Sequence, residues 1–93
     1  MKGECPMKIL LVEDDAALRG ALEELLCREG YEVIKASNAS LARSATNSEV
    51  DLIMLDVGLP DGDGVSLCRQ WRDEGVQMPI LFLTAKDEEL GNL

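Results

Sequence analysis

Histidine is absent from this 93-residue chain, and only one Trp, one Tyr and one Phe supply its aromatic content. Its three cysteines, Cys5, Cys27 and Cys68, show no Cys-x-x-Cys spacing. Zinc and iron–sulfur sites need clustered thiolate or imidazole ligands, so a site of that kind is excluded. An odd number of cysteines without such spacing is typical of a reducing compartment, and we expect a cytoplasmic protein. Cys27 and Cys68 fall in helical patterns and are predicted to be small core or boundary residues.

Positive charge is also scarce, since 9 Lys and Arg residues stand against 18 Asp and Glu residues. The net charge of −9 disfavours direct binding to nucleic acid or to an anionic membrane, both of which attract basic surfaces. No apolar run approaches the length of a membrane span, and the N-terminal residues lack the hydrophobic stretch of a signal peptide. The length fits one domain with one hydrophobic core.

Three short apolar runs each end in a polar residue. They are residues 9–12 before Glu13-Asp14-Asp15, residues 52–55 before Asp56, and residues 80–83 before Thr84. Short apolar runs of this kind are typical of buried parallel strands. In an open α/β sheet, ligands bind beyond the carboxyl ends of the strands. The sequence therefore predicts that at least three carboxylates and a hydroxyl meet at one edge of one sheet.

Such an acidic cluster needs a proton or a cation. Two carboxylates about 4 Å apart repel each other by roughly 4 kcal/mol at the effective dielectric of a protein surface. Because the expected ligands are all oxygens, the cation would be a hard one: Mg²⁺, Mn²⁺ or Ca²⁺. An exposed Asp beside such an ion is also a candidate nucleophile for phosphoryl groups.

Strand and helix patterns alternate along the whole chain, which predicts an α/β fold with a parallel sheet. Trp71 is spaced as a packing residue in the third helix. Residues 58–64 contain one Pro and three Gly, and are predicted to form a loop without regular structure. The predicted strands are 8–12, 32–36, 52–55 and 80–83, the predicted helices are 16–29, 38–45 and 65–72, and Asp87-Glu88-Glu89 would begin a fourth helix.

From Lys8 onward the chain resembles the receiver domain of bacterial two-component response regulators. The resemblance rests on the acidic group after the first strand, on Asp56, on Leu59-Pro60-Asp61-Gly62-Asp63-Gly64, and on Leu83-Thr84-Ala85. It implies a flavodoxin-like, doubly wound sheet with strand order 2-1-3-4-5. Residues 1–93 would be one receiver domain that lacks the last strand and helix. Around these motifs the sequence most resembles that of regulators that carry a C-terminal winged-helix DNA-binding domain.

The resemblance also implies roles for single residues. Asp56 would accept a phosphoryl group from a sensor histidine kinase, in a regulatory, self-catalysed transfer rather than as an enzyme. Mg²⁺ (or Mn²⁺) would be bound by Asp14, Asp56 and the backbone carbonyl of Gly58, with Glu13 reaching the ion through water. Thr84 would hydrogen-bond the phosphoryl group, and Asp15 would point away or cap the first helix.

Complete receivers add a strand that delivers a lysine to the phosphoryl group, and this chain shows no such strand. Two alternatives therefore stay open. One is a degenerate or truncated receiver that acts only through protein contacts. The other is a Mg²⁺-dependent aspartyl-phosphate phosphatase, whose acidic motif resembles Asp61-Gly62-Asp63-Gly64 but would directly follow a buried strand. Without a fifth strand the fourth becomes a bare apolar edge, and we expect a homodimer. No contact with nucleic acid or membrane is expected through this domain.

Overall fold

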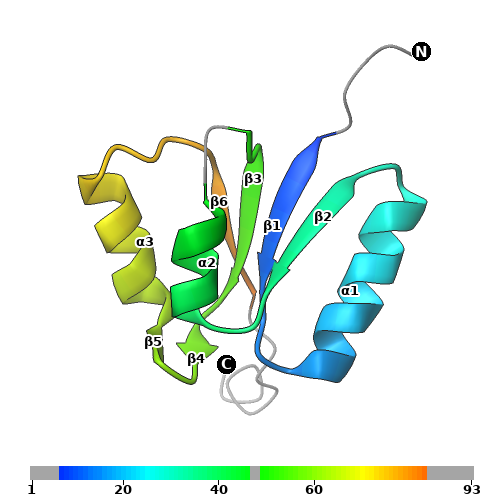
Figure 1. Ribbon diagram of the computed structural model, residues 1–93, viewed down its shortest axis with the longest axis horizontal. Helices are drawn as coiled ribbons and strands as arrows, with labels where there is room; N and C mark the ends of the chain where they lie inside the picture. Colours follow the sequence, from blue (N-terminus) through cyan, green and yellow to red (C-terminus); the bar gives the residue numbers. More distant parts are fainter. Residues whose placement is uncertain (1–6, 47–48, 84–93) are drawn as a thin grey trace, which may run out of the picture.

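The computed structural model describes residues 7–46 and 49–83. These residues form a four-stranded parallel sheet with helices on both faces, and a small antiparallel hairpin (Figure 1). The elements in chain order are β1 (Lys8–Val12), α1 (Ala16–Arg28), β2 (Glu32–Ala36), α2 (Ala39–Ala45), β3 (Leu52–Asp56), β4 (Gly58–Leu59), β5 (Gly62–Asp63), α3 (Gly64–Asp73) and β6 (Ile80–Leu83). The predicted α/β class is confirmed.

The sheet order is β2-β1-β3-β6, which is the expected 2-1-3-4 arrangement of the first four long strands. The apolar runs pair in parallel, with Val12 opposite Ala36 on one side and Leu55 on the other. Residues 9–12 of β1 are all buried, and in β3 Ile53 and Leu55 are buried while Leu52 and Met54 are half-buried, which agrees with the continuous apolar runs of these central strands. Asp56 is the last residue of β3 and pairs with Leu83 of β6.

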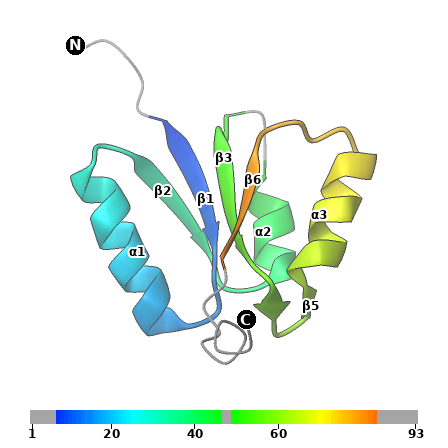
Figure 2. The same cartoon turned by 180° about the vertical axis from the view of Figure 1, so that it is seen from behind.

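The helices are divided between the two faces of the sheet. As Figure 2 shows from behind, α1 lies on one face, beside β2, while α2 and α3 lie on the other. The main hydrophobic core lies between the sheet and the α2/α3 layer, where Ala42, Leu67 and Trp71 are buried. The packing role predicted for Trp71 is confirmed, since its side chain is only 2% exposed. By contrast, no residue of α1 is buried.

Short polar side chains begin each helix. Asp15 accepts hydrogen bonds from the backbone N–H groups of Ala17 and Leu18, so its predicted capping role is confirmed. Asn38 caps α2, and Asp63 caps α3. Gly30 and Gly75 follow α1 and α3 with φ values of 95° and 92°, a left-handed conformation that side chains disfavour.

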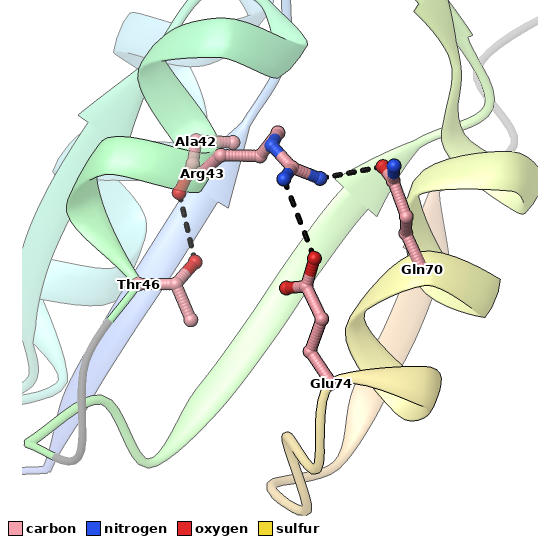
Figure 3. A network of polar contacts seen from close by, with 5 residues as sticks. All are labelled: Ala42, Arg43, Thr46, Gln70 and Glu74. Carbon is pink, nitrogen blue, oxygen red and sulfur yellow. Dashed lines mark hydrogen bonds and ion pairs between the residues drawn. The ribbon is translucent and has the colours of Figure 1, made fainter.

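A polar network joins α2 to α3 on the outer side of that layer (Figure 3). The Arg43 guanidinium donates to the Gln70 side-chain oxygen and pairs with Glu74, 3.3 Å away. Thr46 closes the end of α2 by donating from its hydroxyl to the Ala42 carbonyl, at 2.8 Å. The two Arg43 contacts that link the helices are exposed, so they contribute little to the stability of the fold.

Two local expectations are wrong. Residues 58–64 are not free of regular structure, because β4 and β5 pair antiparallel, with Gly58 opposite Asp63 and Leu59 opposite Gly62. Leu59 is buried, which anchors the hairpin against the core. Cys27 is exposed and is not a core or boundary residue, whereas Cys68 is half-buried as expected. Thr84 and the predicted helix start at residues 87–89 lie outside the described residues.

β6 is the outermost strand on its side of the described sheet, as expected for the fourth strand. Two of its apolar side chains are open to solvent, since Leu81 is 52% and Phe82 is 38% exposed. None of the helices in the described part of the chain is long and apolar enough to cross a membrane.

Candidate functional site

The acidic site is assembled by the register of the two central strands. Val12 pairs with Leu55, so the next residue along each strand direction, Glu13 just after β1 and Asp56 at the end of β3, lies at the same edge of the sheet. Carboxylate oxygens of Glu13, Asp14 and Asp56 lie within 4.8 Å of one another. The predicted meeting of three carboxylates at this edge is therefore confirmed.

Two of the three carboxylates are deeply buried. Glu13 is 2% and Asp56 is 1% exposed, whereas Asp14 is exposed to solvent. Glu13 Oε1 and Asp56 Oδ2 are buried and have no hydrogen-bond partner among the described residues. Nor does any cationic side chain in residues 7–46 and 49–83 form an ion pair with the three acids. At these separations two charged members repel each other by roughly 3.5 kcal/mol at an effective dielectric of about 20.

Burial raises the pKa of the Glu13 carboxyl above its ordinary range. The backbone N–H of Asp15 opposes this shift by donating to Glu13 Oε2, at 3.1 Å. The negative charges of Asp56 and Asp14 raise the Glu13 pKa further. The site thus favours the uptake of a positive species, either a proton or a cation.

A hard divalent cation fits this donor set. The converging atoms are all oxygens, which Mg²⁺ and Mn²⁺ prefer over nitrogen or sulfur. An ion would also give partners to the two buried oxygens that lack them. Gly58 begins β4 two residues after Asp56 and is exposed, next to the acidic edge. Thr84, the predicted hydroxyl contribution, lies outside the described residues.

Gly64 lies directly against the backbone of Asp56, a close approach that the sequence did not predict. A Cβ atom on Gly64 would overlap the Asp56 carbonyl oxygen and would lie 3.1 Å from the Val57 Cα. The Gly64 N–H also donates to the Val57 carbonyl, at 2.7 Å. Only a residue without a side chain allows α3 to begin so close to the end of β3. The glycine-rich composition of the loop was the one available signal.

The contacts of Asp61 and Arg19 were also not predicted from the sequence. The Asp61 carboxylate accepts hydrogen bonds from the first two N–H groups of α2, those of Ala39 at 2.7 Å and Ser40 at 3.1 Å. These donors lower the pKa of Asp61. Arg19, on α1, donates from Nη1 to the Glu13 carbonyl oxygen, at 2.7 Å. The Asp61 contacts join residues more than 20 positions apart, whereas the Arg19 contact spans only six residues across the start of α1.

The family profile described as "Response regulator receiver domain" matches residues 9–91 of the chain. The chain belongs to this family. Its acidic site lies at the carboxyl edge of the receiver sheet, built from the residues on which the sequence resemblance rested. The phosphoacceptor assignment of the family is thereby supported for this receiver domain.

Among curated proteins, this receiver domain is 47% identical over 83 residues to the "Alkaline phosphatase synthesis transcriptional regulatory protein PhoP" of Bacillus subtilis (strain 168). The match covers 88% of the chain and 35% of that protein. The chain thus spans about a third of the length of the curated relatives it matches.

Two solved structures extend the comparison. The "Non-phosphorylated HemR Receiver Domain from Leptospira biflexa" matches with a TM-score of 0.80 and 38% identity, covering 92% of this chain and 73% of that one. The Thermotoga maritima complex of "histidine kinase ThkA (TM1359) in complex with response regulator protein TrrA (TM1360)" matches with a TM-score of 0.77 and 32% identity, covering 85% and 69%. The flavodoxin-like receiver fold is shown, with its C-terminal part outside the described sheet.

Proposed function

We propose that Asp56 is the phosphoacceptor of this receiver domain. The observation that carries the proposal is the Asp56 carboxylate itself, which is buried at the carboxyl edge of the sheet with Oδ2 unpartnered and two further acids beside it. In the transfer, an Asp56 oxygen forms a bond to phosphorus while the bond from phosphorus to the donor's leaving atom breaks. The leaving atom keeps the electron pair, and the product is an acyl phosphate on Asp56.

The proposed metal is Mg²⁺, or Mn²⁺ in its place. Asp14, Asp56 and the Gly58 carbonyl would hold the ion directly, and Glu13 would hold it through water. When bound, the ion would offset the negative charge of the phosphoryl oxygens. Thr84 would donate a hydrogen bond to a phosphoryl oxygen, a role that rests on the sequence alone.

The proposed donor is a sensor histidine kinase. Support comes from the Thermotoga complex, in which a structurally similar response regulator protein is bound to a histidine kinase. We propose a regulatory domain that catalyses its own phosphorylation, and a cytoplasmic location, which agrees with the exposed thiol of Cys27. The names of the curated relatives support transcriptional regulation. That a winged-helix domain outside these 93 residues would contact DNA rests on the sequence resemblance alone.

We also propose that the chain forms a homodimer. The exposed side chains of Leu81 and Phe82 and the absence of charge within β6 favour pairing of this edge with its copy. Sedimentation velocity over a range of concentrations tests it: we expect a monomer–dimer equilibrium. A compact monomer at high micromolar concentration would show that β6 is not a dimer edge.

Acetyl phosphate with Mg²⁺ and intact-mass spectrometry test the phosphoacceptor. We expect the 93-residue chain to gain one phosphoryl group slowly. Complete receivers bring a lysine to the phosphoryl group on a further strand, and none of the strands predicted from this sequence delivers one. Asp56→Asn should gain none. Asp73→Asn is the matched control, since Asp73 is an exposed residue at the end of α3.

The outcomes separate the open alternatives. An adduct lost only in Asp56→Asn supports the proposal, whereas one that persists in Asp56→Asn places the acceptor elsewhere. Rapid release of inorganic phosphate without an adduct would favour the phosphatase. No reaction after prolonged incubation would favour a receiver that acts only through protein contacts.

A further inference from the structure

We propose that Arg19 is a positioning residue that fixes the direction of Asp14 at the metal site, an inference that rests on the proposed function. Arg19 lies on the second turn of α1 and is half-buried. Its Nη1 donates to the Glu13 carbonyl oxygen, at 2.7 Å. This bond reaches from the helix back to the chain segment that carries two of the three acids.

The orientation of the Glu13 carbonyl determines how the backbone enters Asp14. A peptide bond is planar, so this oxygen lies in one rigid plane with the nitrogen and Cα of Asp14. The Glu13 N–H makes a last sheet contact with the Ala36 carbonyl, at 3.0 Å, and beyond it the chain leaves the sheet. Arg19 therefore fixes the peptide plane from which the Asp14 side chain projects.

The rest of the turn is fixed from the other side. The Asp15 N–H donates to Glu13 Oε2, and the Asp15 carboxylate caps α1. Asp14 is exposed whereas Glu13 and Asp56 are buried, so packing restrains the Asp14 side chain less than it restrains the other two. The direction of its carboxylate depends on the backbone between two anchored neighbours, and Arg19 is the side chain that anchors the preceding peptide.

Because Arg19 is charged, the direction in which metal affinity changes when it is replaced distinguishes the possible roles of Arg19. Arg19 carries a positive charge and its Nη1 lies 2.7 Å from the Glu13 carbonyl oxygen, so it repels a cation bound by the neighbouring carboxylates, and removing its charge alone would tighten metal binding. Removing a positioning contact would loosen metal binding instead, because the ligands would no longer be pre-arranged. A purely structural contact would change the melting temperature and leave metal affinity unchanged.

The experiment is a calorimetric titration of the 93-residue chain with Mn²⁺, paired with thermal denaturation of the metal-free protein. Arg19→Met keeps an unbranched side chain but removes both the donor and the charge. We expect its Mn²⁺ binding to be about tenfold weaker. Arg28→Met is the matched control, since it removes the same charge from an exposed position on the same helix. Its affinity should stay within about twofold of the wild type.

Arg19→Lys provides a second variant should Arg19→Met fold poorly. It keeps the charge but loses the planar, multi-donor head group, and its Mn²⁺ binding should also weaken. Affinity at the wild-type level in the folded variants, or tighter binding in Arg19→Met, would overturn the proposal while leaving Asp56 as the phosphoacceptor. A wild type that binds no Mn²⁺ would overturn both the metal site and the role of Arg19.

Discussion

Replacing Gly64 by Ala is expected to destabilise the domain and to disturb Asp56 at the same time. The added Cβ would overlap the Asp56 carbonyl oxygen and lie 3.1 Å from the Val57 Cα. Both are backbone atoms, so no side-chain rotation can relieve the overlap, and the first turn of α3 must move away from the end of β3. Forcing an extra carbon into a packed site costs roughly 1–3 kcal/mol.

The expected change in melting temperature follows from that cost. Alanine restricts the unfolded chain more than glycine does, which returns about 0.4–1 kcal/mol. A net loss of roughly 1–2 kcal/mol lowers the melting temperature of a domain of this size by about 5–15 °C. Because the displaced atoms belong to Asp56 and Val57, Mn²⁺ affinity should fall as well.

Circular dichroism melting with and without Mn²⁺ measures both effects. Gly20→Ala is the matched control, because Gly20 is an exposed position within α1 and a Cβ there would meet nothing within 4 Å. That substitution should stabilise the helix by up to about 1 kcal/mol. The two glycines should therefore respond with opposite signs. A Gly64→Ala variant that melts at or above the wild-type temperature would show that the close approach is not a constraint.

The remaining predictions concern the acids. Mg²⁺ or Mn²⁺ should raise the melting temperature of the wild type, and Asp14→Asn should abolish that rise; equal rises in both proteins would contradict the metal site. Because the folded-state pKa of Glu13 is raised, its ionisation destabilises the fold, and the loss grows as pH rises from the ordinary value of 4.5 through the raised pKa. Without metal, Glu13→Gln should therefore melt above the wild type at pH 7 and lose that advantage below pH 4.5. An advantage that persists at low pH would point to packing and not to titration.

The sequence predicted the parts of the fold that depend on local pattern. Continuous apolar runs predicted both central strands, and the residues after them predicted Glu13 and Asp56 at one edge. That success has a physical basis: parallel strands end at a common edge, so strand ends identify neighbours without any knowledge of packing. The capping role of Asp15 is equally local.

The contacts that the sequence did not predict depend on how elements pack against one another. Asp61 was assigned to a turn, yet it accepts two hydrogen bonds from α2, about 20 residues earlier in the chain. Gly64 was one of several glycines in a loop, and only the fold shows the backbone that its missing side chain accommodates. The exposure of Cys27 has the same origin, since no element in the described part of the chain packs over that side of α1.

The helices are buried to different extents, which determines which part of the domain unfolds locally first. α3 contributes Leu67 and Trp71 to the core, whereas no residue of α1 is buried. Local unfolding costs least where few apolar contacts are lost, so amide protons in α1 should exchange with solvent before those in α3. The turn that carries Glu13 and Asp14 is anchored to α1 through Asp15 and Arg19. Local unfolding of α1 would then disrupt the acidic site while the β3–α3 core stays folded. A cation that bridges the acids would therefore slow amide exchange throughout α1.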